Sequence, residues 1–258
     1  RKTRSSVKEE KALGERASMN GTNPAQLGSS LRDNVRWLGK LLGDTVAEQE
    51  GPEVLEQVEW IRKLAKKARK GDETAYGQLM EGLQSMTTEK ALPVARAFAQ
   101  FLALANIAEQ HHRLRRRRQY QRGLLGRPQR ASFDAVFQNL LDDGVSRKAL
   151  FHAVSELKIE LVLTAHPTEV NRRTLLQKHN EVADLLAESD REDRTPEERE
   201  QIEGSLRQVI TSIWQTDEIL RRRPSPQEEA RGGLYVFEQS LWNAVPRYMR
   251  SLDRALQS

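Results

Sequence analysis

The residues with the most evident chemistry lie in the segment LVLTAHPTEVNRR, at positions 161 to 173. His166 follows an apolar run there, and Pro167 keeps the histidine backbone out of the helical region. An imidazole titrates near neutral pH, so His166 is a candidate for proton transfer. The alternative is a histidine that only bonds a neighbouring backbone group at a strand end. A metal site built on His166 and Glu169 is disfavoured, because Pro167 disrupts helical spacing and no third ligand is nearby.

The element that must position His166 is the run LKIELVLT, residues 157–164. Its compact, branched and apolar composition predicts a strand buried on both faces. A strand followed by a polar cluster and a helix is typical of a βα unit in a parallel barrel or sheet, whose reactive groups sit at the C-terminal ends of strands. It is the only strand that we predict, and a lone strand leaves backbone groups unpaired. Its sheet partners are therefore expected outside this sequence.

Arg172 and Arg173 would open the helix after this strand, where cations oppose the helix dipole. A bound anion would resolve that conflict by using the guanidinium groups and the free N–H groups together. Compensation by Glu169 or by another acidic residue is the alternative. Arg221 and the two arginines after it are a second possible contributor to an anion site, although cations at a helix C-terminus need no ligand.

A strongly basic stretch, HHRLRRRRQYQRGLLGRPQR, fills residues 111–130. It could bind phosphate groups around Tyr120, or it could be a charged helix end and loop in contact with solvent. We favour the second interpretation, because sequence-nonspecific nucleic-acid binding usually adds stacking aromatics. His111 and His112 point to different helix faces, so they are not expected to ligate one metal ion together.

Composition indicates a soluble helical protein. The 258 residues are 37% hydrophobic, 31% charged and 5% aromatic, and a net charge of +5 is spread over 42 basic and 37 acidic side chains, which is typical of solvated helix surfaces. We find no run of about 18 apolar residues and therefore expect no membrane span. The chain has no cysteine, and it begins RKTRSSVKEE, without Met or an apolar signal segment. We therefore expect a cytoplasmic protein whose true start is missing.

Helical spacing dominates the rest of the chain. Residues 1–30 are polar and rich in Gly, Asn, Pro and Ser, which predicts a flexible arm. Residues 31–156 are predicted to form an N-terminal helical region, and residues 157–258 to hold the strand, the histidine loop and further helices. Helix starts are predicted at or just after Ser30, Pro52, Asp72, Thr88, Ser132, Ser146, Asn171, Thr195 and Ser225. The core face expected of the long helix from Thr88 to about Arg118 consists of Phe98, Phe101, Leu102, Ala105 and Ala108.

The segment VLTAHPTEVNRR, residues 162–173, resembles the first signature of the phosphoenolpyruvate carboxylase family. The stretches ARAFAQFLALANIAEQHH, RTLLQKHNEV, TDEILRRRPSP and SLWNAVPRYMRSLD are also similar to that family, so the resemblance covers roughly residues 30 to 258. It implies a (β/α)8 barrel elaborated with helices, to which this chain contributes the N-terminal helices and the first strand. We therefore expect a predominantly α-helical chain in which the barrel is incomplete.

The resemblance implies an enzyme that carboxylates phosphoenolpyruvate with bicarbonate, giving oxaloacetate and phosphate, with Mg2+ or Mn2+ as the metal. Bicarbonate attacks the phosphoryl group, and the resulting carboxyphosphate releases carbon dioxide to the enolate of pyruvate. His166 matches the catalytic histidine, the base that takes the carboxyphosphate proton. Arg172 and Arg173 match positions that help to bind a sugar-phosphate activator in plant-type members, and we group Arg221 with them as a tentative allosteric anion site.

Other parts of the family pattern have no match in these 258 residues. They are the GGDRDGNP segment, the carboxylate metal ligands, the phosphate-binding arginines and a glycine-rich mobile loop. The metal ligands are therefore expected outside this chain, and the chain alone is expected to be inactive. The full-length enzyme is expected to be a cytoplasmic homotetramer under allosteric control.

Two other classes of function stay open. One is a basic helical scaffold that binds nucleic acid or an acidic protein through residues 113–130. The other is a helical interaction module that folds independently.

Overall fold

The computed structural model describes residues 24–126, 128–162, 173–191, 193–217 and 225–257. Regular structure in these ranges is helical throughout, which confirms the predominantly α-helical prediction. The chain forms two compact units. We name them the α2–α9 unit (Ala25–Leu114 and Thr174–Ile219) and the α6–α11 unit (Arg1–Pro24, Arg115–Arg173 and Leu220–Ser258). The predicted division of the chain at residues 156 and 157 stays a prediction.

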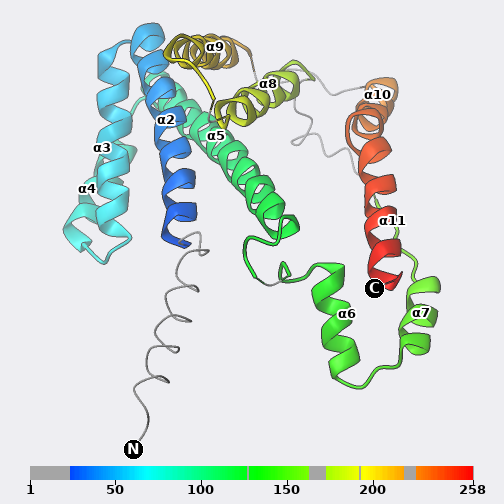
Figure 1. The fold of residues 1–258 in the computed structure, drawn as a ribbon. Helices are drawn as coiled ribbons and strands as arrows, with labels where there is room; N and C mark the ends of the chain where they lie inside the picture. The colour runs from blue at the N-terminus through cyan, green and yellow to red at the C-terminus, as the bar shows by residue number, and fades with distance from the viewer. Residues whose placement is uncertain (1–23, 127, 163–172, 192, 218–224, 258) are drawn as a thin grey trace, which may run out of the picture. The chain divides into compact units, whose positions relative to one another are not determined.

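The α2–α9 unit is a layered set of helices (Figure 1). It contains α2 (Pro24–Glu50), α3 (Pro52–Ala68), α4 (Glu73–Gln84), α5 (Thr88–Gln121), α8 (Arg173–Ser189) and α9 (Pro196–Trp214), with α5 continuing past Leu114 into the other unit. Figure 1 shows α3 and α4 side by side as an antiparallel pair, and these two helices are in contact. The sequence explains the helix ends. Gly51 adopts a φ of 98° after α2, and Asp72 accepts a hydrogen bond from the Ala75 N–H at the start of α4.

A single apolar core holds this unit together. On α9, the buried side chains recur at helical spacing, so one face of the helix is apolar along its length. They pack with buried residues of α2, α5 and α8. The largest fully buried side chains of this core are Trp214, Leu38, Leu41, Leu104, Leu186, Leu206, Ile210, Ile213, Val46 and Val182.

The long helix α5 turns a different face to the core than predicted. Ala108 is buried as expected, but Leu102 is 60% exposed, and Phe101 is only partly buried against the core. The buried stripe instead consists of Val94, Ala97, Gln100, Leu104, Ile107, Ala108 and His111. Alanines and polar residues complete this stripe, and they gave too weak an apolar signal to set the orientation of the helix from sequence.

By length and composition, α5 is apolar enough to cross a membrane, contrary to our expectation that no segment would be. A third of its most apolar window, 33%, is buried inside the protein. Core helices of soluble proteins pass the same length and composition test, so the property is weak evidence for a membrane span.

The α6–α11 unit has a smaller core. It contains α6 (Phe133–Asp142), α7 (Arg147–Ser155), α10 (Pro226–Val236), the π-helix η1 (Phe237–Leu241) and α11 (Trp242–Gln257). Ser132, Ser146 and Ser225 cap three of these helices as predicted, each accepting a bond from a backbone N–H. Phe137, Leu150 and Ala255 form the buried centre, so α6, α7 and α11 meet there.

The predicted strand at residues 157–164 is absent over its described part, residues 157–162, which form neither helix nor strand. Its apolar side chains face solvent, with Leu157 and Ile159 each 60%, Leu161 64% and Val162 78% exposed. A strand requires a neighbouring strand to accept its backbone hydrogen bonds, and the described residues provide none.

Three smaller differences concern helix boundaries. The first helix begins at Pro24 instead of Ser30, in keeping with the preference for proline in the first helical turn. Apolar spacing predicts that the helix after Thr195 continues to Leu220, but the helix ends at Trp214, and Leu220 lies outside the described residues. The helix predicted from Ser225 onwards is interrupted by η1. Pro246 does not interrupt it, because this proline lies inside the continuous helix α11.

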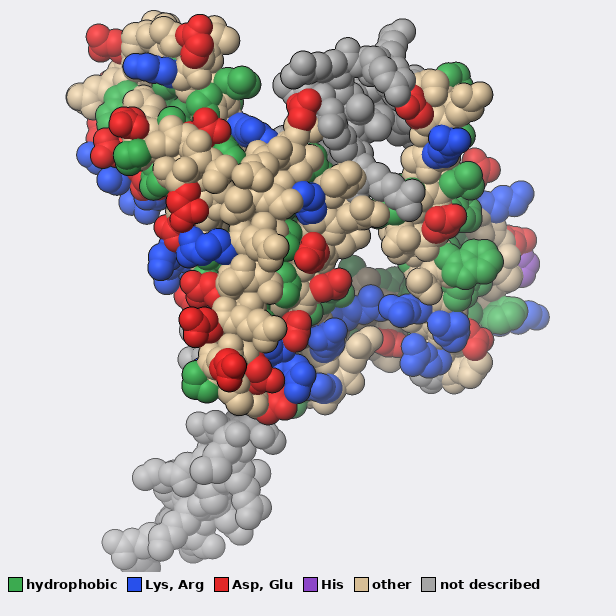
Figure 2. All heavy atoms as spheres, turned by 90° about the horizontal axis from the view of Figure 1, so that it is seen from above, with side chains coloured by type: hydrophobic (Ala, Val, Ile, Leu, Met, Phe, Trp, Pro, Cys, Tyr) green, Lys and Arg blue, Asp and Glu red, His purple; other side chains and the backbone are tan. Residues whose placement is uncertain are grey.

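Charged side chains of both signs cover the surface. Figure 2 shows acidic and basic groups interspersed over the visible face. Many are paired along one helix, as in Arg62 with Glu59 (2.6 Å) and Arg113 with Glu109 (2.6 Å). Hydrogen bonding from Arg62 lowers the pKa of Glu59. Such pairs fit a solvated helix surface and contribute little to stability individually.

Replacing Leu206 by alanine should lower the free energy of unfolding by about 2–5 kcal/mol, because the side chain is fully buried and a cavity would remain. Urea unfolding followed by circular dichroism measures the loss. The control is Leu102→Ala, the same change at a position that is 60% exposed, which should cost roughly 0.5 kcal/mol or less. Equal losses for the two variants would contradict the assigned core.

Replacing Glu198 by glutamine should destabilise the chain at neutral pH but not in acid. The Thr195 backbone N–H donates to the Glu198 carboxylate (2.8 Å), and this bond lowers the pKa of Glu198 below its ordinary value of 4.5. The stabilisation is complete above the unfolded pKa and is lost as the pH falls through the lower folded pKa. Melting temperatures across this pH range test the effect. Glu200→Gln, which leaves the capping box intact, should shift them far less, and a pH-independent effect of Glu198→Gln would disprove the explanation.

Candidate functional site

The residues predicted to carry chemistry lie at the edge of what the structure describes. His166, Arg172 and Arg221 are outside the described residues. Arg173 is the first residue of α8, but its side chain is not described. Their assembly into one site therefore stays a prediction, and the described residues show only the elements that flank it.

The flanking element after His166 is well anchored. Helix α8 begins at Arg173, the last residue of the HPTEVNRR segment, and its residues Leu175, Val182 and Leu186 are buried in the core of the α2–α9 unit. In the sequence, Leu175, His179, Val182 and Leu186 recur at helical spacing, which predicts that they share one face of this helix. On the N-terminal side of the segment, the described residues 157–162 carry the exposed apolar side chains of the run that starts at Leu157.

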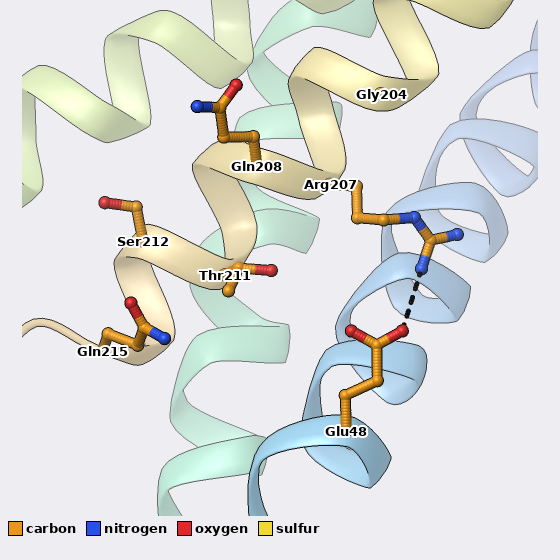
Figure 3. Close-up of a pocket in the computed structure, with 7 residues that line it drawn as sticks. All are labelled: Glu48, Gly204, Arg207, Gln208, Thr211, Ser212 and Gln215. Carbon is orange, nitrogen blue, oxygen red and sulfur yellow. Dashed lines mark ion pairs between the residues drawn. The ribbon is translucent and has the colours of Figure 1, made fainter.

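A polar hollow of about 480 Å³ lies between α2 and α9 (Figure 3). Figure 3 shows the Arg207 side chain extending from α9 towards Glu48, whereas Gln208 and Ser212 point away from it. Arg207 forms ion pairs with Asp44 (3.3 Å) and with Glu48 (3.8 Å), both on α2. Among the described residues, the only guanidinium group that lines this hollow is therefore already neutralised by two carboxylates.

Several hydroxyl and amide groups around the hollow are also engaged. Thr45 is fully buried, donates to the Leu41 carbonyl (2.9 Å) and lies 3.4 Å from the hydroxyl of Thr211. The Gln215 amide donates to Gln49 Oε1 (2.9 Å). These bonds join α2 to α9, so we interpret the hollow as a structural seam of the fold. Sequence reasoning missed this seam, because its polar residues are 163–166 positions apart in the chain.

Two buried side chains lie close to carboxylates elsewhere in the α2–α9 unit. His111 is 5% exposed, and its Nε2 lies 3.0 Å from Asp190 Oδ2. The side chain of Arg194 is equally buried and lies 3.1 Å from Glu188. Each contact ties the region after α8 to neighbouring structure. His111 thus has a carboxylate contact, and the expectation that His111 and His112 do not share a metal stays a prediction.

A divalent metal finds no ready site among the described residues, because no three His, Asp or Glu side chains there are close enough to hold one.

Some arginines of the basic stretch at 111–130 have contacts within the protein. Arg113 pairs with Glu109, and the Arg116 guanidinium lies 5.7 Å from the ring centre of Tyr120. Part of its charge is therefore neutralised or stacked within the protein.

Comparison with known proteins assigns the family. The family model described as phosphoenolpyruvate carboxylase matches residues 31–258. The chain is 44% identical over 242 residues to the phosphoenolpyruvate carboxylase of Acinetobacter baumannii, a match that covers 90% of this chain and 26% of that protein. The enzyme of the same name from Acinetobacter baylyi is 45% identical over 228 residues, covering 88% and 25%, respectively.

The corresponding enzyme of Pseudomonas aeruginosa is 45% identical over 231 residues, with coverage of 90% of this chain and 26% of the relative. The chain thus spans about a quarter of the length of the relatives that it matches. The family match includes the whole HPTEVNRR segment and every described helix except the start of α2. The chain belongs to the phosphoenolpyruvate carboxylase family.

Proposed function

We propose that this chain supplies the catalytic histidine of a phosphoenolpyruvate carboxylase, an enzyme of the carboxy-lyase class that forms oxaloacetate and phosphate from phosphoenolpyruvate and bicarbonate. The observation that carries the proposal is the family match over residues 31–258, which contains HPTEVNRR. The reaction replenishes oxaloacetate, so the role is anaplerotic carbon fixation. Because the chain spans about a quarter of the length of its relatives, the complete activity is proposed for the assembled enzyme.

In this proposal His166 acts on carboxyphosphate. A bicarbonate oxygen attacks the phosphoryl group, the phosphorus–oxygen bond of phosphoenolpyruvate breaks, and the electron pair leaves as the enolate of pyruvate. The His166 imidazole then accepts the proton of the carboxyphosphate carboxyl group, so that its carbon–oxygen bond to phosphate breaks and carbon dioxide forms. The enolate carbon attacks carbon dioxide and gives oxaloacetate. An imidazole with a pKa near neutrality suits a base for this step.

We infer that the segment from Leu157 becomes the first strand of a (β/α)8 barrel in the assembled enzyme. Support comes from its exposure, because neighbouring positions of alternating direction, Leu161 and Val162, are both more than 60% exposed and apolar. A strand of a parallel barrel is covered by the barrel interior on one face and by helices on the other, and it needs apolar residues on both. The strand would place His166 at its C-terminal end.

The described residues do not fit the metal of this family, since they contain no cluster of three potential ligands. Because the carboxylate ligands of the family pattern also have no match in the sequence, we propose that Mg2+ or Mn2+ is held by ligands outside this chain, and we derive no step from the metal. For the same reason the chain alone is expected to be inactive. Arg172, Arg173 and Arg221 are proposed as an allosteric anion site, and the assembled enzyme as a cytoplasmic homotetramer.

The role of His166 can be tested in a chimera. Residues 31–258 of this chain replace the matching segment of the Acinetobacter baylyi relative, which is 45% identical, and the chimera is assayed for oxaloacetate. His166→Asn should abolish net carboxylation but leave bicarbonate-dependent phosphate release, because formation of carboxyphosphate precedes the proton transfer. Unchanged carboxylation would refute the role of His166, and an inactive but folded chimera would refute the wider proposal.

The 258-residue chain is the second sample in the same assay. We expect no oxaloacetate above the blank, because the groups that stabilise the enolate and phosphoryl charge are assigned elsewhere. Bicarbonate-dependent turnover by the isolated chain would contradict that assignment.

A further inference from the structure

We propose that a hollow between the end of α5 and α11 binds a small molecule carrying phosphate groups. The hollow has a volume of about 1540 Å³, and its lining residues belong to the α6–α11 unit alone. They come from the C-terminal end of α5, from residues 123–134 and from one face of α11. The proposed carboxylation does not use any of these residues.

The charge of the lining is strongly unbalanced. Arg117, Arg247 and Arg254 line the hollow together with one carboxylate, that of Asp134, among the described residues. Arg247 and Arg254 are seven positions apart on α11, which places them on the same side of the helix about two turns apart. Guanidinium groups arranged around a concave surface suit phosphate, because each can donate two parallel hydrogen bonds.

These arginines have no acidic partner in the described part of the chain, in contrast to the paired arginines of other surfaces. Arg62, Arg113 and Arg207 each lie within 3.3 Å of a carboxylate. By contrast, no carboxylate among the described residues forms an ion pair with the three arginines of the hollow. Like charges around a shared concave surface raise the local potential, and a bound anion lowers it. This contrast also distinguishes the hollow from the seam in Figure 3, where Arg207 is paired twice.

Aromatic contacts hold the walls in place. The Phe133 ring packs edge-on against Tyr248 (5.1 Å between centroids, 70° between planes) and lies 5.9 Å from Phe137. Phe137 and Ala255 are buried in the small core below. The start of α6 is thus fixed against α11, so two of the arginines and the first turn of α6 are positioned before any ligand arrives.

Two further features favour a compact anion over an extended nucleic acid. The N-terminal turn of α6 opens at the hollow through Ser132, Phe133 and Asp134, and helix N-termini favour negative charge. Of the aromatic residues that line the hollow, Tyr248 and Phe133 pack on each other and Tyr120 is covered by the Arg116 guanidinium, so little aromatic surface remains on which successive bases could stack. Gly123 (φ 70°) and Gly126 (φ 63°) shape the segment between α5 and α6, and no atom lies within 4 Å of where their Cβ atoms would be.

Inorganic pyrophosphate is the test ligand for the 258-residue chain, followed by isothermal titration calorimetry. We expect saturable binding that weakens as ionic strength rises. The double variant Arg247→Gln/Arg254→Gln should raise the dissociation constant by about tenfold or more, since it removes charge-assisted bonds to the ligand. Arg250→Gln is the matched control on the same helix; it removes one exposed positive charge that does not line the hollow, and should change the constant by about twofold at most.

Three results would overturn the proposal. They are absence of saturable binding, equal weakening by the control and the double variant, and tight binding of random-sequence duplex DNA that displaces pyrophosphate and survives the double substitution. The last would assign the charge to a nucleic-acid surface.

Hydrogen exchange gives a readout that does not depend on the folding of the variants. Saturating pyrophosphate should slow amide exchange within residues 123–126 and 128–134 and leave residues 204–214 of α9 unchanged. Slowing in both segments, or in neither, would refute a site at this hollow.

Discussion

The α2–α9 unit depends on an apolar contact between two distant parts of the chain, Ala25–Leu114 and Thr174–Ile219. Closing this contact loops out residues 115–173, at an entropic cost that grows only slowly with loop length. Each fully buried Leu, Ile or Val side chain contributes roughly 1.5–3 kcal/mol relative to exposure. The buried side chains of α8 and α9 together therefore outweigh the cost of closure, and α8, which begins at the last residue of HPTEVNRR, is held at a defined place.

Apolar contacts alone would allow α9 to slide along α2. Polar bonds between the two helices fix its axial position. The Trp214 indole donates to Glu50 (3.0 Å), Thr45 lies 3.4 Å from Thr211, and Arg207 reaches Asp44 (3.3 Å). A shift of one helical turn would break all of these bonds and leave Thr45 buried with only its Leu41 bond. The hollow between the two helices is a consequence of this polar seam.

Local chemistry made most of the helices predictable. Asp72, Ser132, Ser146, Thr195 and Ser225 cap helices where the sequence placed them, because capping needs only residues within one turn. The predicted orientation of α5 was wrong because four of the seven residues in its buried stripe are alanine, glutamine or histidine, and the burial of such residues depends on what the neighbouring helices present. The predicted strand is absent from the described residues because its formation depends on a partner strand, which local sequence cannot supply.

The candidate site could be predicted only as far as residue types and order allow. His166 and Arg172 were identified because proline, histidine and paired arginines have strong local meaning, but their geometry lies outside the described residues. Conversely, the arginines at the end of α5 and on α11 are more than 120 positions apart in sequence, from Arg117 to Arg247, and only the fold brings them to one hollow.

The exposed apolar run and the proposed role of His166 place two demands on the assembled enzyme, and one structure can meet both. Burying Leu157, Ile159, Leu161 and Val162 requires a surface that also satisfies the backbone groups of the run, which a parallel sheet does. The proton transfer requires preorganised charges around the departing phosphate and the enolate, because a base alone removes only part of the barrier. A barrel meets both demands at once, since forming its sheet buries the run and brings the ends of the other strands around the histidine. On this proposal, folding of the strand and completion of the active site are one event.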